Sequence, residues 1–275
     1  MIEIPEAFNL AQKINEFMVG KKITETIANR NPHKFAWFYG NPEDYIGKIN
    51  GKAVANAVSF GGLVEATLDS LKLVFGDGVN LKYSPPGEKI PLKHQLLLKF
   101  EDNSFLTASI RMYGGIWCFK DGDFDNEYYW KAKQKISVFS DDFDFNYFKQ
   151  IVLNENVKSK SVKAVLATGQ NIPGLGNGVL QDILFNAGIN PKKKIDSLSA
   201  EGVKALFNSV KKTLEEMKDK GGRDTEKDLF GEPGAYKTKM SANTIKDPCP
   251  VCGNKIIKEA YMGGSIYYCP NCQKI

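Results

Sequence analysis

Hydrophobic and polar positions divide the chain into three successive patterns. Between residues 6 and 18, apolar residues recur every three or four positions, which predicts an amphipathic helix that ends before VGKK. From about residue 22 to 120, short alternating or apolar runs such as KAVANAVSF and HQLLLKF lie between turn residues. Beyond residue 148 the helical period returns. This order predicts an α+β fold in which an N-terminal helix and β-sandwich precede a helical half.

Turn and capping residues mark finer boundaries within these patterns. FGDGV and FEDNSF are predicted to be hairpin turns, because Asp-Gly and Asp-Asn adopt the conformations that tight turns require. In the helical half, SVKAVLATG, NGVLQDILFNAG and SAEGVKALFNSVKKTLEEMKDKGG predict three helices. The third is predicted to begin after an N-cap at Ser199 and to stop at Gly221 and Gly222.

An acidic and aromatic stretch over residues 120–148 separates the β-rich half from the helical half. It contains KDGDFDNEYYW and SDDFDFNYF, and we interpret it as the passage between domains. The predicted boundaries are residues 1–130 for a β-sandwich domain, 131–240 for a helical domain and 241–275 for a small cysteine-containing module.

Composition and charge exclude several classes of protein. The chain has 275 residues, 42% apolar and 25% charged, which is typical of a globular protein with room for two domains. Its net charge of +5 permits a polyanionic partner without requiring one. No apolar run is long enough to span a bilayer and no signal peptide begins the chain, so we expect a cytoplasmic protein with no membrane partner.

Four of the five cysteines form a C-x2-C-x16-C-x2-C pattern, made by Cys249, Cys252, Cys269 and Cys272. This spacing is typical of a site in which four thiolates hold Zn2+, whereas two disulfides would be unusual in a cytosolic chain. Four sulfur ligands would fill the tetrahedral shell, so we predict one structural Zn2+. The intervening KEAYMGGSIYY predicts a two-stranded hairpin that either contacts nucleic acid or serves only as a staple. Cys118 lies in an apolar stretch and is expected in the core.

The segment NIPGLGNGVLQDILF is a second candidate site. A helix precedes it and its glycines lie at every second position, so it does not match a dinucleotide-binding turn. A loop that opens a helix with Gly-Asn-Gly exposes backbone N–H groups at the positive helix end, and Asn177 adds an amide donor. Such a loop suits a phosphate, although a tight turn without any ligand has the same sequence features.

Together these features resemble the formamidopyrimidine-DNA glycosylase and endonuclease VIII family of base-excision repair enzymes. The similar parts are the terminus MIEIPE, the β-rich first half, the IPGLGNGVLQDILFNAGINP segment, the GGRDTEKDLFG stretch and the closing zinc ribbon. The resemblance covers nearly the whole chain. It implies a helix-two-turn-helix domain, a β-ribbon zinc finger, and a monomer that binds duplex DNA containing a damaged base or an abasic site.

The family resemblance also implies an active site at the chain terminus. In that family the amine of the second encoded residue, a proline, attacks the sugar C1′, and the resulting Schiff base permits strand cleavage. One site is thus both DNA glycosylase and AP lyase. By position, Ile2 matches the nucleophile, Glu3 matches a carboxylate that assists proton transfer, and Glu6 matches a supporting carboxylate.

The family's DNA contacts map onto two further segments. Asn177, beside Gly176, matches a phosphate-binding asparagine, while Arg111 matches an arginine that fills the space left by the flipped base. Tyr113 matches the aromatic wedge beside it. These enzymes extrude their target because the sugar carbon is inaccessible inside a duplex. Without the resemblance, Arg111 and Tyr113 would be ordinary strand residues.

Four positions depart from the family pattern. Ile2 replaces the proline, and Gly62 stands where a lysine contacts phosphate. Gly264 replaces an arginine at the zinc-hairpin tip, and Tyr83 stands where a void-filling methionine is usual. Isoleucine at position 2 disfavours removal of Met1. Three hypotheses therefore remain: a processed Ile2 attacks, the amine of Met1 attacks, or the protein binds damaged DNA without cutting it. The lesion, and the preference for duplex or single strand, stay open.

Overall fold

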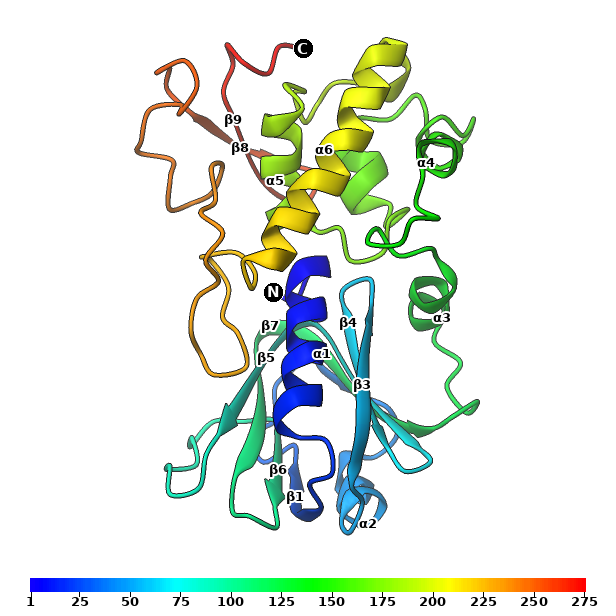
Figure 1. Ribbon diagram of the computed structural model, residues 1–275, viewed down its shortest axis with the longest axis vertical. Helices are drawn as coiled ribbons and strands as arrows, with labels where there is room; N and C mark the ends of the chain where they lie inside the picture. The colour runs from blue at the N-terminus through cyan, green and yellow to red at the C-terminus, as the bar shows by residue number, and fades with distance from the viewer.

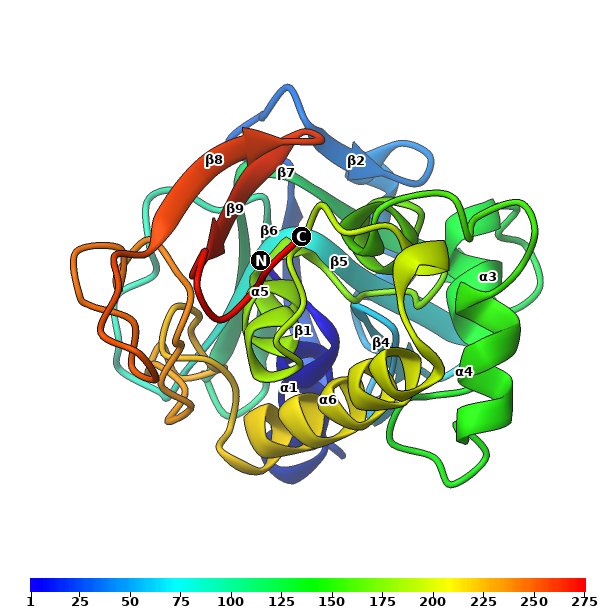
Figure 2. The ribbon, with the colours of Figure 1, turned by 90° about the horizontal axis from the view of Figure 1, so that it is seen from above.

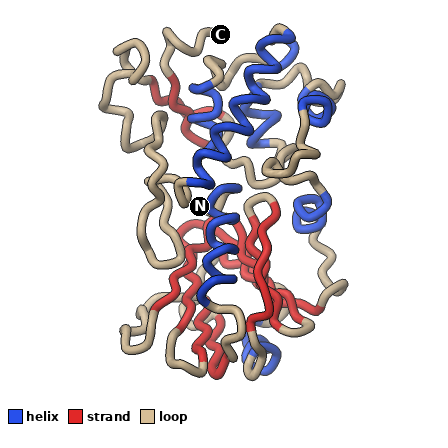
Figure 3. Tube along the Cα trace, in the orientation of Figure 1, coloured by secondary structure: helices blue, strands red, loops and turns tan.

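The computed structural model describes residues 1–275 and confirms the predicted α+β class. The two halves stack along the long axis, with strands gathered in the N-terminal half and helices in the C-terminal half (Figures 1 and 3). The N-terminal half contains α1 (Ile4–Phe17), a 3-10 turn (Pro42–Asp44), α2 (Tyr45–Ile49), β1 (Ile23–Ala28), β2 (Ala36–Phe38), β3 (Val54–Phe60), β4 (Leu63–Leu68), β5 (Leu71–Ser84), β6 (Leu96–Phe100) and β7 (Phe105–Lys120).

The C-terminal half contains the remaining elements. They are α3 (Glu127–Gln134), α4 (Phe145–Val152), a π-helical turn (Ala164–Thr168), α5 (Asn177–Asn186), a 3-10 turn (Ile195–Ser197), α6 (Ala200–Asp219), β8 (Ile257–Tyr261) and β9 (Gly264–Tyr268). No helix is both long and apolar enough to cross a membrane.

The predicted sandwich is built from one continuous sheet in the order β1-β6-β7-β5-β4-β3, with β2 added parallel to β7. The long strands β5 and β7 pair with each other over their whole lengths at the centre of the sheet. On one side β4 and β3 follow β5, and on the other β6 and β1 follow β7. Residues from both ends and from α1 share one hydrophobic core. The core includes Cys118, as predicted, and burial raises the pKa of its thiol to about 11.

One predicted hairpin is wrong and one is confirmed. FEDNSF is the turn between β6 and β7, where Asn103 adopts a φ of 64°. FGDGV instead continues β5 and forms a bulge, at which the pairing with β7 shifts between Asp77 and Val79. Asp77 has a φ of 55°, a conformation that both a turn and a bulge use, so the dipeptide alone did not distinguish them.

Helix α1 joins the two halves. It begins with Pro5 in its first turn and with a capping box between Glu3 and Glu6. Ala7, Leu10 and Ile14 on its apolar face are buried in the core of the N-terminal half.

The helical half is confirmed in outline and richer than predicted. Ser199 accepts a hydrogen bond from Gly202 N at 3.1 Å and caps α6, which ends before Gly221 as expected. The first predicted helix is only the π-helical turn, and the presumed passage between domains holds α3 and the start of α4. Seen from above, α5 lies between α6 and the β8–β9 hairpin (Figure 2).

Candidate active site and nucleic-acid interface

The first four residues lie between the two halves and are bonded to both. Ile2 N donates to the carbonyl of Asp77 at 2.7 Å, which uses the β5 bulge. Ile4 N donates to the carbonyl of Gly174 at 3.1 Å, in the loop before α5. The side chains of Ile2 and Ile4 are buried. The terminus is therefore an ordered part of the junction.

Glu3 caps α5 from the other half of the molecule. Its Oε1 accepts from Gly178 N at 2.9 Å and its Oε2 accepts from Val179 N at 2.7 Å. Burial raises the pKa of Glu3, a shift that Arg223 and these two hydrogen bonds oppose. The free N–H groups that the sequence suggested for a phosphate are thus partly engaged by a carboxylate of the protein itself.

Glu6 is the partner of a buried arginine that sequence reasoning did not single out. Arg223 donates from Nε and Nη2 to the two carboxylate oxygens of Glu6, at 2.9 and 2.8 Å. Nη1 of Arg223 also lies 3.5 Å from Glu3 Oε2. All three side chains are almost fully buried, so Glu6 supports the site through Arg223 and does not face solvent.

The terminal amine of Met1 forms an ion pair with Glu226. Both groups line a cavity of about 400 Å³ between β5, the N-terminal part of α1 and the loop that follows α6. Ile2, Arg111 and Lys82 also line it. The nitrogen of Ile2 is a backbone amide bonded to Asp77, whereas the amine belongs to Met1, a cavity-lining residue that is 39% exposed.

Arg111 and Tyr113 lie on β7 and belong to an exposed, mainly apolar patch, and Arg111 also lines the cavity. Arg111 is exposed and makes no hydrogen bond or ion pair with the protein. The ring of Tyr113 lies 5.7 Å from that of Trp37, which is 45% exposed. Met112, in the same patch, is 66% exposed. A free guanidinium and several exposed rings can stack on bases.

Asn177 is half-buried, and both ends of its side-chain amide are bonded to the protein. Its Oδ1 accepts from Lys163 Nζ at 2.9 Å, and its Nδ2 donates to the carbonyl of Ser265 in β9 at 2.7 Å. Lys163 also donates to the carbonyl of Tyr261 at 2.8 Å, and burial lowers the pKa of its ammonium. Gly176 is the N-cap of α5. This cluster joins the loop, α5 and the hairpin tip.

The two glycine departures have direct structural consequences. A Cβ on Gly174, whose φ is 76°, would lie 1.9 Å from Gly62 N, so the backbones of the two halves meet without side chains. A Cβ on Gly62 itself would lie 3.1 Å from the carbonyl oxygen of Ile2. A Cβ on Gly264 would lie 3.5 Å from Lys163 Nζ, so the buried Lys163 side chain lies beside the hairpin tip.

The four C-terminal cysteines converge as the spacing predicted. The sulfur atoms of Cys249, Cys252, Cys269 and Cys272 all lie within 4.8 Å of one another, and none forms a disulfide. Four thiol groups at this separation can hold one metal ion. The cluster therefore has the arrangement that a four-cysteine metal site requires.

Comparison with known proteins agrees with the resemblance. A family model described as the formamidopyrimidine-DNA glycosylase H2TH domain matches residues 137–227. A formamidopyrimidine-DNA glycosylase of Shouchella clausii is 30% identical over 70% of this chain and 69% of its own. The chain belongs to the formamidopyrimidine-DNA glycosylase family.

Full-length similarity extends this assignment. The formamidopyrimidine-DNA glycosylase of Lactobacillus delbrueckii subsp. bulgaricus is 27% identical over 100% of both chains. The Lactococcus lactis glycosylase has been solved with DNA containing an abasic site, and its structure superimposes on this one with a TM-score of 0.85 at 21% sequence identity. The match covers 99% of this chain and 100% of the Lactococcus lactis chain. The same enzyme solved with Fapy-dG DNA has a TM-score of 0.84. The family consists of DNA repair glycosylases, and the fold is theirs throughout.

Within this glycosylase fold, sequence reasoning missed Arg223, Glu226 and Lys163. Arg223 and Glu226 lie in GGRDTEKDLFG, a stretch that the family resemblance included without assigning roles. A run of charged residues in a loop has no periodic pattern that would predict its position. Only the folded structure shows that this loop lies against the N-terminus of the chain. Lys163 was hidden inside an apolar helical pattern.

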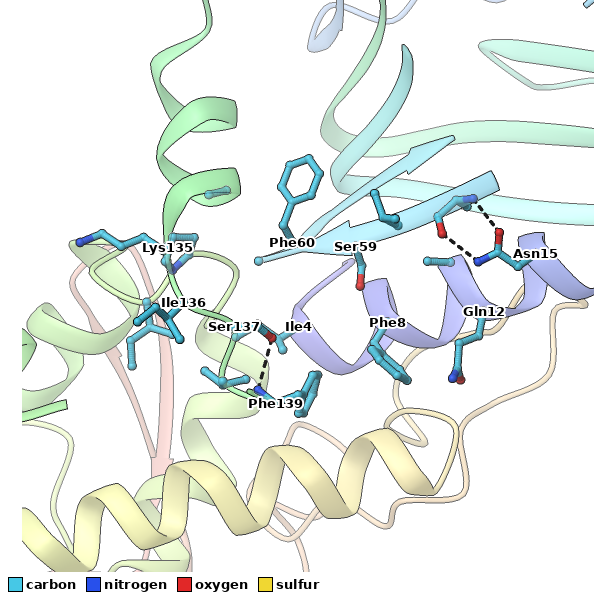
Figure 4. Close-up of a pocket in the computed structure, with 18 residues that line it drawn as sticks. Ile4, Phe8, Gln12, Asn15, Ser59, Phe60, Lys135, Ile136, Ser137 and Phe139 are labelled. Atoms are coloured by element: carbon cyan, nitrogen blue, oxygen red, sulfur yellow. Dashed lines mark hydrogen bonds between the residues drawn. The ribbon is translucent and has the colours of Figure 1, made fainter. Parts of the chain in front are cut away.

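A second cavity, of about 360 Å³, lies on the other side of α1 in this member of the glycosylase family. Figure 4 shows that Ile4, Phe8 and Phe139 point into it, and the rings of Phe8 and Phe139 are 5.3 Å apart. Among its lining residues only Lys135 is titratable. Since it contains neither a carboxylate nor the terminal amine, it does not resemble a catalytic site.

Proposed function

We propose that the protein is a base-excision repair enzyme that binds duplex DNA containing a damaged base or an abasic site, flips the target nucleotide and acts as DNA glycosylase and AP lyase. The observation that carries this proposal is the Met1 amine, which opens onto a polar cavity at the junction of the two halves. A primary amine in such a cavity can attack C1′ of a flipped sugar once it has lost its proton.

The exposed residues around the cavity support DNA binding. Arg111 and Lys82 line the cavity and can neutralise phosphate, while Tyr113 and Trp37 present rings that can stack in the vacated space. Asn177 and Gly176 would act mainly by holding the two-turn loop and the zinc hairpin in one rigid surface, since both ends of the Asn177 amide are bonded.

We propose one structural Zn2+ at the cysteine cluster. The soft sulfur donors and their close spacing fit this ion, and four protein ligands leave no position for a substrate. Zn2+ would order the ribbon and thereby hold β8 and β9 against α5.

Of the two candidate nucleophiles, the structure favours the amine of Met1 over that of Ile2. Ile2 N is bonded to Asp77 and its side chain fills the core, whereas the Met1 amine reaches the cavity. Glu3 and Glu6 organise the site, because their oxygens are bonded to α5 and to Arg223. The raised pKa of Glu3 is compatible with the proton transfer expected of it.

Borohydride trapping tests the proposal. Oligonucleotides with single oxidised purines, oxidised pyrimidines or an abasic site are incubated with the protein and reduced, and mass spectrometry identifies the cross-linked residue. We expect a trapped complex on the N-terminal peptide, with the preferred oligonucleotide identifying the lesion. Salt-dependent binding without any trapped complex would instead support the alternative, a non-catalytic binder of damaged DNA.

A binding titration at several salt concentrations measures the DNA contacts. We expect a monomer whose affinity for abasic duplex falls as salt rises, because phosphate contacts release counterions. Absence of binding at roughly 50 mM salt, where phosphate contacts are strong, would contradict both forms of the proposal.

A further inference from the structure

The carboxylate that touches the terminal amine is not one of the two predicted from the sequence. Both oxygens of Glu3 accept backbone hydrogen bonds from α5, and both oxygens of Glu6 accept from Arg223. Glu226 alone pairs with the Met1 amine, and its side chain remains 24% exposed to the cavity.

The loop that carries Glu226 is tethered to α1 and to the sheet of the N-terminal half. Arg223, where the loop begins, is bonded to Glu6, and the carbonyl of Glu226 accepts from Gly234 N at 3.3 Å. Toward the sheet, Tyr83 N donates to the carbonyl of Leu229 at 2.7 Å, and Lys13 of α1 pairs with Asp228 at 2.6 Å. Glu226 therefore occupies a defined position beside the amine.

We infer that Glu226 is a catalytic residue that carries a proton between the Met1 amine and the departing oxygen during Schiff-base formation. The inference rests on the proposed lyase function. A carboxylate in contact with an amine can accept its proton and later return it, provided that both stay within hydrogen-bond reach.

The step balances without any further reactant. Glu226 first takes one proton from the ammonium, and the freed lone pair of nitrogen bonds to C1′ of the open-chain abasic aldehyde. The carbonyl electrons move to oxygen, which takes a second proton from nitrogen. Glu226 then protonates this hydroxyl, which leaves as water while nitrogen forms the C=N bond. Both protons lost by the ammonium leave in the water.

Single-turnover trapping on abasic DNA tests this role with Glu226→Gln. We expect a rate about 100-fold below that of the parent, since a general acid-base group contributes on this order. Affinity for a reduced abasic analogue should stay within about twofold of a matched control. The control is Glu215→Gln, which changes net charge equally at an exposed position on α6.

Chemical rescue separates catalysis from a structural role. Formate added to Glu226→Ala should restore at least about a tenth of the lost rate, because a small carboxylate can take the vacated place. Trapping by Glu226→Gln within about threefold of the parent would overturn the inference, and so would cross-linking of the parent through Ile2.

A DNA-free reaction distinguishes failure of the inference from failure of the proposed function. Protein, propanal and cyanoborohydride are mixed, and alkylation of the Met1 amine is followed by mass spectrometry. A slower reaction in Glu226→Gln than in Glu215→Gln would support the role of Glu226 even if abasic DNA were not trapped. Equal rates, with the parent trapping DNA, would overturn the role and leave the lyase function standing.

Discussion

Arg223 and Glu6, which are 217 positions apart in the sequence, form a buried bidentate ion pair. We predict that Arg223→Ala lowers the free energy of unfolding by about 3–5 kcal/mol, because it leaves Glu6 and Glu3 as uncompensated buried carboxylates. Denaturant unfolding measures the loss. Arg111→Ala is the control: its exposed guanidinium has no partner, so its stability should change by less than about 0.5 kcal/mol. Equal losses in the two variants would contradict this account.

The contact between Gly174 and Gly62 predicts intolerance of even one methyl group. Gly174→Ala should destabilise the protein by more than about 2 kcal/mol, because a left-handed conformation and a backbone clash add together. Gly221→Ala serves as the matched control, since its φ is 71° but no atom lies within 4 Å of the added methyl. It should cost only about 1 kcal/mol of backbone strain. Thermal unfolding of both variants provides the comparison.

The turn between β6 and β7 predicts a defined dependence of stability on pH. Partial burial raises the pKa of Asp102, but hydrogen bonds from Lys21 and Ser104 outweigh it and hold the pKa at about 2, below the ordinary value of 3.8. A lowered folded-state pKa stabilises the protein above pH 4, and this contribution disappears as the pH falls toward 2. The stability difference between the parent and Asp102→Asn should therefore shrink over this interval.

An exposed aspartate provides the control for that experiment. Asp141 makes no hydrogen bond, so Asp141→Asn should leave the shape of the stability curve unchanged. A difference between the parent and Asp102→Asn that stays constant from pH 6 to pH 2 would show that the hydrogen bonds to Asp102 have no net effect on stability.

Removal of metal should affect the ribbon before the rest of the protein. With a chelator, we expect release of one zinc ion per chain and faster amide exchange over residues 249–273, because the small ribbon core packs directly around its cysteines. Exchange in β5 and β7, which belong to a separate core, should change little. Cys249→Ser should reproduce the effect without chelator. Unchanged exchange in the ribbon would contradict a structural metal.

The sequence predicted those parts of the fold that are marked by a local pattern, such as a hydrophobic period, a capping residue or a fixed cysteine spacing. Helix α1, the capped α6 and the cysteine cluster were predicted because apolar spacing, Ser199 and paired CxxC turns are local patterns. Local patterns failed at Asp77, where a turn signal belonged to a bulge. They also gave no sign of α3, whose aromatic residues pack on the outside of the sheet.

The site was harder to predict than the fold because its contacts join distant segments. Position in the family pattern selected Glu3 and Glu6, yet only the three-dimensional arrangement showed that one caps α5 and the other holds Arg223. Glu226 meets the amine across 225 positions, a separation at which no pattern along the chain can report contact.

The bonds that hold Met1 to Ile4 between the two halves impose an order on folding. The first residues to leave the ribosome find their partners at Asp77, Gly174, Val179 and finally Glu226. Domains form in sequence order during synthesis, so the terminus can reach its place only after four-fifths of the chain has been made. Any enzyme that trims the nascent end therefore meets an unfolded terminus, so the identity of the first residue is settled before any of these contacts forms.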